Sequence, residues 1–168
     1  MKLIPLSIWK KNGKYKNLLA KVDDEDYDFL MQWRWTVIKR KTVNTFYAIR
    51  TIKGVAHFRM HRVIMGATNP SIQIDHIDGD GLNNQRSNLR FATQLQNNMN
   101  RRKQAKKSHS KYKGVVFRDM NKYKKWCAII RLSGVVYRKS FVLEEDAATW
   151  YDNKAKELFK EFANLNFK

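Results

Sequence analysis

The sequence has a single cysteine, few acidic residues and no long hydrophobic run. Cys127 has no second cysteine to pair with, which excludes an internal disulfide and a Cys-rich zinc module and predicts a reducing compartment. No stretch approaches the ~18 consecutive apolar residues of a membrane-spanning helix. Residues 1–16 carry charge but lack the apolar centre of a secretion signal, so export is not expected.

Positive charge dominates what is present. The 168 residues include 34 Lys and Arg against 15 Asp and Glu, which gives a formal net charge of +19. A hydrophobic content of 43% is too high for a disordered basic tail, and the length suits one ordinary domain or two small ones. Such a protein is expected to bind a polyanion, nucleic acid first. Charge alone does not separate an enzyme acting on nucleic acid from a passive structural binder.

The acidic residues form three groups along the chain. Residues 23–28 and 144–146 lie where helices are predicted to begin, so these groups are expected to complement helix dipoles. The third group, Asp75, Asp78 and Asp80, lies beside His76 among basic residues. Carboxylates on a surface that meets phosphates repel them unless a cation lies between the two, so this group is the candidate metal site.

Hydrophobic patterns divide the chain into three segments. Residues 1–66 show β-rich composition at 14–22 and 46–52, a short helical period at 24–33, and a helix over 60–65 that ends at Gly66. The third segment predicts strands at 112–118, 123–132 and 135–141, with a hairpin turn at Ser133-Gly134. An amphipathic helix over 144–162 is expected to cover that sheet.

The middle segment, residues 71–103, carries the chemistry. A strand at 72–74 delivers Asp75 and His76, a Gly- and Asp-rich loop follows, and residues 89–92 form a second strand. Thr93 and Gln96 have capping-box spacing, which predicts a helix from Thr93 through Arg101 with Asn97 in its first turn. An imidazole can activate water, and a carboxylate with one amide suffices for Mg²⁺. The alternative is a loop whose Asp and Asn residues only cap turns.

The spacing of this middle segment resembles that of HNH homing endonucleases. The matching stretches are Ile74-Asp75-His76-Ile77-Asp78-Gly79-Asp80, Leu82-Asn83-Asn84, Ser87-Asn88-Leu89-Arg90 and Gln96-Asn97. The match to the phage and intron-encoded branch, whose fold is called ββα-metal, is close. The resemblance implies a metal-dependent DNA endonuclease in the cytoplasm of a bacterium or phage-infected cell.

The same resemblance implies a role for each matched residue. His76 would be the general base, and Asp75 and Asn97 would hold a single divalent ion, Mg²⁺ or Mn²⁺. Asn88 would brace the loop and orient His76. Asn98 is an alternative ligand to Asn97, but neighbouring helical residues point about 100° apart, so only one of them can face the site. His61 is expected to be structural or to contact the site from behind.

The third segment resembles the Apetala2/ethylene-response-factor DNA-binding domain, which lays a three-stranded sheet into the major groove. Four stretches carry the likeness: residues 110–115, residues 125–131, Ala147-Ala148 with Tyr151-Asp152, and residues 161–167. Val116 stands where plant members usually have a base-reading Arg, so guanine recognition there is not expected. By position, the expected DNA contacts are Lys113, Arg118, Lys125, Arg131, Tyr137 and Lys139.

These patterns predict an α+β protein: an HNH nuclease domain with an N-terminal extension at 1–100, a basic linker at 101–110, and a three-stranded antiparallel sheet packed on one helix at 111–168. Arg101, Arg102 and Lys103 of the linker are expected to follow phosphates, the alternative being a solvated helix end. The predicted function is site-specific cleavage of double-stranded DNA by a monomer that nicks one strand, without an obligate protein partner. The alternatives are an inactive DNA-binding regulator and a structural RNA-binding protein.

Overall fold

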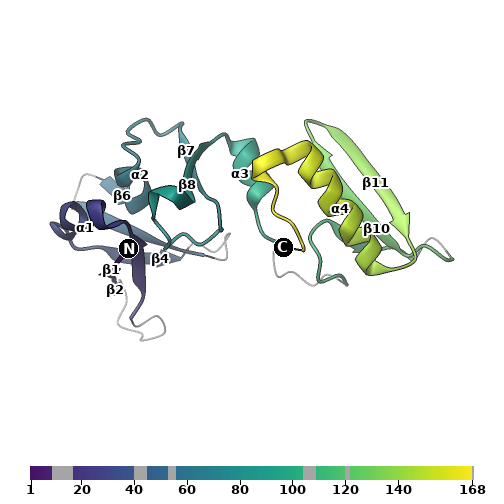
Figure 1. Cartoon of the computed structure of the whole chain (residues 1–168), viewed down its shortest axis with the longest axis horizontal. Helices are drawn as coiled ribbons and strands as arrows, with labels where there is room; N and C mark the ends of the chain where they lie inside the picture. Colours follow the sequence, from purple (N-terminus) through teal and green to yellow (C-terminus); the bar gives the residue numbers. More distant parts are fainter. Residues whose placement is uncertain (9–16, 40–44, 53–55, 104–108, 120–121, 168) are drawn as a thin grey trace. The chain divides into compact units, whose positions relative to one another are not determined.

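The computed structural model describes residues 1–8, 17–39, 45–52, 56–103, 109–119 and 122–167. These residues form two compact units, unit 1 at residues 1–97 and unit 2 at residues 98–168 (Figure 1). Both units mix helices with small sheets. No helix in the described ranges is long and apolar enough to cross a membrane.

Unit 1 contains three small sheets. A four-stranded sheet has the order β2-β4-β5-β6, in which only the β2–β4 pair is parallel. A two-stranded antiparallel sheet joins β1 to β3, and an antiparallel hairpin joins β7 to β8. The strands are β1 (Lys2–Pro5), β2 (Ser7–Ile8), β3 (Leu19–Val22), β4 (Thr36–Lys39), β5 (Phe46–Ile52), β6 (Ala56–Arg59), β7 (Gln73–His76) and β8 (Leu89–Ala92).

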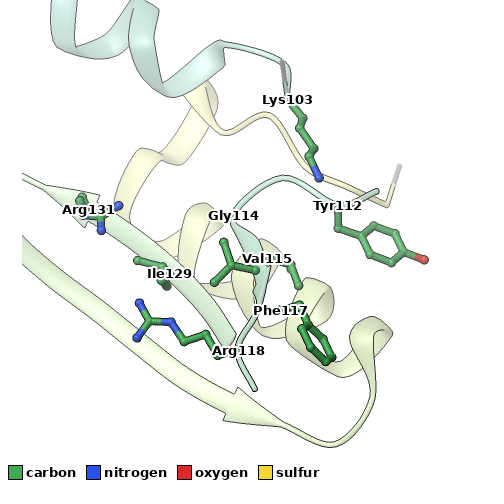
Figure 2. A pocket seen from close by; sticks show the side chains of 9 residues that line it. Lys103, Tyr112, Gly114, Val115, Phe117, Arg118, Ile129 and Arg131 are labelled. Atoms are coloured by element: carbon green, nitrogen blue, oxygen red, sulfur yellow. The ribbon is translucent and has the colours of Figure 1, made fainter. Parts of the chain in front are cut away.

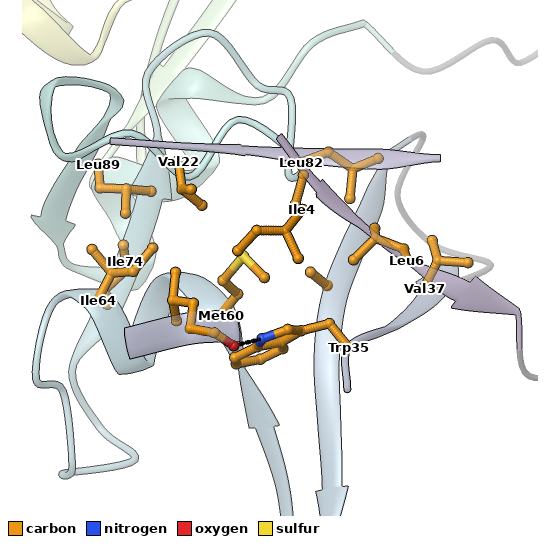
Figure 3. Packing of buried hydrophobic residues seen from close by; sticks show 13 residues of the cluster. Ile4, Leu6, Val22, Trp35, Val37, Met60, Ile64, Ile74, Leu82 and Leu89 are labelled. Atoms are coloured by element: carbon orange, nitrogen blue, oxygen red, sulfur yellow. Dashed lines mark hydrogen bonds between the residues drawn. The ribbon is translucent and has the colours of Figure 1, made fainter. Parts of the chain in front are cut away.

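Three helices and one 3₁₀ turn complete this part of the chain: α1 (Asp24–Met31), α2 (Met60–Ile64), η1 (Arg86–Asn88) and α3 (Gln94–Asn100), whose last turn falls in unit 2. The core of unit 1 collects side chains from most of these elements (Figure 3). Trp35 belongs to this core and is 1% exposed. Its indole Nε1 donates to the carbonyl of Leu30 at 2.8 Å, which satisfies the buried N–H. This core supports the β7–β8 hairpin through Ile74 and Leu89.

Unit 2 is a three-stranded antiparallel sheet with one long helix along its face. The sheet has the order β11-β10-β9, with β9 (Val115–Phe117), β10 (Trp126–Leu132) and β11 (Val135–Phe141), and α4 (Glu144–Phe159) packs on it (Figure 1). Ser133 and Gly134 link β10 to β11 with φ values of 48° and 84°, the left-handed pair that a two-residue hairpin needs. A 3₁₀ turn, η2 (Lys160–Phe162), follows α4.

Most of the predicted elements are confirmed, with shorter ends. The strands at 46–52, 89–92 and 135–141 have the predicted bounds. The strand predicted at 14–22 is present as Leu19–Val22, and residues 14–16 lie outside the described residues. The helix predicted through Arg101 ends at Asn100, and the helix predicted to 162 ends at Phe159 because Lys160 adopts φ 50°.

Candidate active site and nucleic-acid-binding face

The β7–β8 hairpin places Asp75 beside a cation of the protein itself. Asp75 is 5% exposed, and its register partner on β8 is Arg90. The Arg90 Nε and Nη2 donate to Asp75 Oδ2 at 3.0 and 2.8 Å. A buried carboxylate needs such a partner, since an unpaired buried charge is strongly unfavourable. Arg90 therefore fixes one oxygen of Asp75.

The first turn of α3 brings Asn97 to the same side of the hairpin. The Thr93 amide donates to Gln96 Oε1 at 2.8 Å and the Gln96 amide to Thr93 Oγ1 at 3.2 Å, so the predicted capping box is confirmed. Asn97 Nδ2 donates to Gln73 Oε1 at 2.9 Å. Residues 73 and 75 are two apart on one strand and therefore share a face.

A carboxylate and an amide on one face suit a hard divalent cation. Because the Asn97 amide donates through its nitrogen, its oxygen is the atom that can serve as a ligand. Asn98 is exposed and points away by helical geometry, so the placement favours Asn97. Among the residues that the structure places, no group of three or more His, Cys, Asp or Glu could hold a metal. The available donors therefore fit Mg²⁺, which keeps several waters, better than zinc.

His76 lies at the end of β7 and is 6% exposed. Its Nε2 lies 3.4 Å from Asn84 Oδ1, and its ring centroid lies 4.9 Å from that of His61 and 6.0 Å from that of Tyr47. Burial lowers the pKa of His76, although Asn84 and the charges of Asp78, Asp75 and Asp80 oppose the shift. His76 is therefore a neutral imidazole at neutral pH, the form that accepts a proton.

His61 packs edge to face against His76, at 85° between the ring planes. It is 4% exposed, and its Nδ1 has no hydrogen-bond partner among the described residues. Burial lowers the pKa of His61 to about 2, helped by repulsion from His76 when that ring is protonated and from Arg59 and Arg62. His61 is thus neutral near pH 7 and packs directly against the His76 ring.

This burial of His61 predicts acid sensitivity. The unfolded chain takes up a proton at His61 below pH 6.5 and the folded chain does not, so the free energy of unfolding falls as the pH falls towards 2. The slope from this group is about 1.4 kcal/mol per pH unit. We expect urea unfolding between pH 7 and 5 to show a smaller pH dependence for His61→Phe than for the native chain. His57→Phe, at an exposed ring, is the control.

Asn88 braces the loop between β7 and β8. Its Oδ1 accepts from the Asp78 amide at 3.0 Å, and its Nδ2 donates to Asp78 Oδ1 at 3.0 Å and to the Asn83 carbonyl at 2.8 Å. The bracing agrees with the prediction. The side chain that accepts from the His76 ring, however, is Asn84 through its Oδ1, while the Asn88 side chain is hydrogen-bonded to Asp78. No spacing in the sequence predicts this contact of Asn84.

Two of the clustered acids act within the loop itself. Asp78 Oδ1 accepts from the Asp80 amide at 2.8 Å, and Asp80 Oδ1 accepts from the Leu82 amide at 3.0 Å. Burial alone would raise the pKa of Asp78, but hydrogen bonds from Asn83, Asp80 and Asn88 hold it below its usual range. These two carboxylates therefore cap turns, which leaves Asp75 as the candidate ligand.

In unit 2, the pairing of the strands divides the sheet into two faces. Ala128, Ile130 and Tyr137 share the face that packs on α4. By alternation and register, the opposite, open face carries Val116, Arg118, Ile129, Arg131, Val136 and Arg138. Among the described residues, the guanidinium groups of Arg118, Arg131 and Arg138 have no hydrogen bond or ion pair. These cations are available to an anionic ligand.

A hollow of about 520 Å³ lies on this part of unit 2 (Figure 2). Lys103, Arg118 and Arg131 line it with Ile129 of the open face and with Phe117, which the register places on the α4 face, so the hollow lies at the β9 edge of the sheet. Cations interleaved with an aromatic ring and aliphatic groups are typical of nucleic-acid-binding surfaces.

Of the six DNA contacts predicted in the third segment, the structure places two on the open face of the sheet and two on the α4 face. Arg118 and Arg131 lie on the open face, whereas Tyr137 and Lys139 lie on the α4 face, where the half-buried Tyr137 packs against the core. The physical reason is strand parity, since positions 137 and 139 of β11 pair with 130 and 128 of β10. The intervening residue, Arg138, is on the open face and was overlooked.

The remaining predicted contacts are partly engaged within the protein. Lys113 Nζ donates to the carbonyl of Met99 at 2.7 Å, and burial lowers the pKa of Lys113 to about 8. Lys125 Nζ lies 2.9 Å from the exposed carboxylate of Asp119. Lys103 Nζ donates to the Ser110 carbonyl. Arg101 and Arg102 are exposed, and residues 104–108 of the predicted linker lie outside the described residues.

Comparisons with known proteins place this geometry in a family. The family model described as HNH endonuclease matches residues 58–99. An uncharacterised HNH endonuclease of Acanthamoeba polyphaga mimivirus is 33% identical over 160 residues, which cover 92% of this chain and 78% of the relative. The chain belongs to the HNH endonuclease family. No solved structure matches it.

Family membership has two consequences for the site. The HNH endonuclease match spans β7, β8 and most of α3, so Asp75, His76, Asn88 and Asn97 all lie within the matched region. The matched region also begins before α2, which carries His61. The buried imidazole of His76 and the neighbouring Asp75 thus lie within the part of the chain that matches a nuclease family.

Proposed function

We propose that this protein is a metal-dependent endonuclease that cuts double-stranded DNA at specific sites, as homing endonucleases do. The observation that supports the proposal is the common placement of Asp75 and Asn97 on one face of the β7–β8 hairpin, with the buried neutral imidazole of His76 following Asp75 at the end of β7. Under this proposal β7, β8 and α3 form the ββα-metal unit of the family.

In the proposed reaction, His76 accepts a proton from the water that attacks the phosphorus, and the bond from phosphorus to the 3′-oxygen breaks. Asp75 and Asn97 would hold one Mg²⁺ or Mn²⁺, which supplies charge stabilisation at the phosphate and the leaving oxygen when bound. Arg90 keeps Asp75 oriented, and Asn88 holds the loop that follows His76. One such site in a monomer cuts one strand, so a nick is the expected product.

A supercoiled plasmid that carries the target site tests the proposal. Nicked circles should form with Mg²⁺ or Mn²⁺ and should not form with a chelator. Candidate target DNA is the genomic sequence that surrounds the gene. Binding without cleavage under every divalent-metal condition would favour the alternative, a DNA-binding regulator with an inactive nuclease fold.

We further propose that the open face of unit 2 binds the major groove, as in Apetala2/ethylene-response-factor domains. Arg118, Arg131 and Arg138 provide the cations for this surface. Nuclease contacts to the backbone near a cut specify little sequence, so a second DNA-binding unit extends the footprint and raises the effective local concentration of the active site.

Arg131→Ala is expected to weaken binding to the target DNA because it removes a cation from the open face. If Arg131 contacts a phosphate, the slope of log K against log salt should fall by about 0.9. If it contacts a base, the preference at one position should relax instead. Titrations at several salt concentrations measure both. Lys139→Ala is the matched control on the α4 face, and equal losses for the two variants would contradict the proposed surface.

A further inference from the structure

The side-chain amide of Asn84 faces the His76 ring within hydrogen-bond distance. Asn84 is 0% exposed, although an amide has four hydrogen-bonding positions to satisfy. Its Nδ2 donates to the carbonyl of Leu82 at 3.2 Å, and its Oδ1 lies 3.4 Å from His76 Nε2. The Leu82 carbonyl can only accept, so it determines which end of the amide faces the imidazole.

This orientation determines the tautomer of His76. An amide oxygen only accepts, so His76 Nε2 must carry the proton that it donates to Asn84. In a neutral imidazole the other nitrogen, Nδ1, is then the proton acceptor. A general base must present its lone pair to the water, so the Asn84 amide selects the nitrogen that does the chemistry.

The position of Asn84 depends on the N-terminal part of the chain. The backbone N–H of Asn84 donates to the Lys21 carbonyl at 2.8 Å, and the backbone N–H of Lys21 donates to the Leu82 carbonyl at 2.8 Å. These bonds attach the loop to β3 around a parallel bridge between Lys21 and Asn83. Lys21 lies outside the residues matched by the HNH endonuclease model.

The acids at the start of α1 make a second attachment just beyond Asn84. Asp23 accepts from Gln85 Nε2 at 3.1 Å and from the Arg86 amide at 2.7 Å. Asp26 is buried and accepts from the Arg86 Nε at 2.9 Å and Nη2 at 2.7 Å, a two-bond ion pair. Glu25 also contacts the Arg86 Nε, at 3.0 Å, but its side chain is 71% exposed. These acids therefore hold the loop as well as facing the helix dipole.

We propose that Asn84 is the positioning residue of His76, which sets its tautomer, and that Asp23 and Asp26 hold Asn84 in place through Gln85 and Arg86. The catalytic consequence of this inference rests on the proposed function. The tautomer itself does not, because it can be observed without DNA.

Nitrogen NMR of the full chain labelled with ¹⁵N-histidine tests the tautomer. The ring shifts distinguish protonated from unprotonated nitrogens, and the signals of His76 are those that disappear in His76→Ala. The native chain should show the proton on Nε2. A proton on Nδ1 of His76 would overturn the proposal, whether or not the protein cuts DNA.

Substitutions at Asn84 test the catalytic consequence. Asn84→Leu keeps the volume but removes the acceptor, so both tautomers should appear and kcat in single-turnover cleavage should fall about 10–100-fold with KM unchanged. Asn84→Asp keeps an acceptor and should retain the Nε2–H tautomer and more of kcat than Asn84→Leu. Native kcat in a folded Asn84→Leu variant would refute the positioning role. Absence of cleavage by the native chain would refute the proposed function alone.

The matched pair Asp26→Asn and Glu25→Gln tests the attachment. Each removes one carboxylate charge from Arg86, but only Asp26 is buried and makes two hydrogen bonds. Asp26→Asn should lower kcat several-fold and shift the His76 ring signals, while Glu25→Gln should change neither. Equal effects of the two variants, or native values in both, would show that the acids do not position Asn84.

Discussion

His76→Ala is expected to lower the rate of DNA cleavage by about 10²–10⁴-fold, the usual cost of removing a general base. The buried imidazole is neutral, so it adds no charge to the attraction between the protein and phosphates, and DNA affinity should be almost unchanged. Single-turnover cleavage of a plasmid with Mg²⁺ measures the first quantity. Binding to the same DNA with a chelator present measures the second.

The chain provides a control for this experiment. His57 is an exposed histidine of β6 whose Nδ1 lies 2.9 Å from Thr51 Oγ1. His57→Ala should therefore cut at the native rate. Normal cleavage by His76→Ala would show that another group activates the water, and a parallel loss of affinity would point to a folding defect instead.

Gly114→Ala should strongly destabilise unit 2, although it adds only one methyl group. Gly114 has φ +73°, which an L-residue adopts at a cost, and an added Cβ would overlap the ring of Tyr151. Tyr151 is 4% exposed at the centre of the core of unit 2, so its ring has no space to retreat. The backbone cost and the overpacking together amount to about 2–5 kcal/mol.

Hydrogen exchange reports this effect unit by unit. Amide protection in β9, β10, β11 and α4 should decrease in Gly114→Ala, and specific DNA binding should weaken with it, while protection in β7 and β8 is kept. Gly134→Ala is the control, since Gly134 has φ +84° but no atom within 4 Å of an added Cβ. Gly134→Ala should lower the free energy of unfolding by about 1–2 kcal/mol, the backbone cost alone. Equal decreases for the two variants would show that the Tyr151 ring moves aside to accommodate the added methyl group.

Local chemistry explains what the sequence predicts well. The capping box of Thr93 and Gln96, the Ser133-Gly134 turn and the apolar face of α4 each depend on residues a few positions apart. Such patterns determine backbone geometry before any tertiary contact forms. They are enough to predict that Asn97 lies in the first turn of a helix that follows the second strand of the hairpin.

Long-range contacts explain what the sequence did not predict. Asp26 and Arg86 are 60 residues apart, and no spacing rule connects them. Asn84 was hidden for a similar reason, because which asparagine reaches His76 depends on how β3 attaches to the loop. The face on which Tyr137 and Lys139 lie depends on the register of β10 with β11. A shift of one residue in that register would move every side chain of the strand to the other face of the sheet.

The ammonium of Lys113 has a consequence for where the second folding unit begins. It donates a hydrogen bond to the carbonyl of Met99, whose side chain packs against the core of unit 2. The next carbonyl, that of Asn100, accepts from Asn164 Nδ2 at 2.8 Å. A fragment that starts at residue 111 would lose these partners and leave a half-buried lysine without its acceptor. A fragment of unit 2 should therefore begin at residue 98 and include the last turn of α3, part of which lies within the residues matched by the HNH endonuclease model.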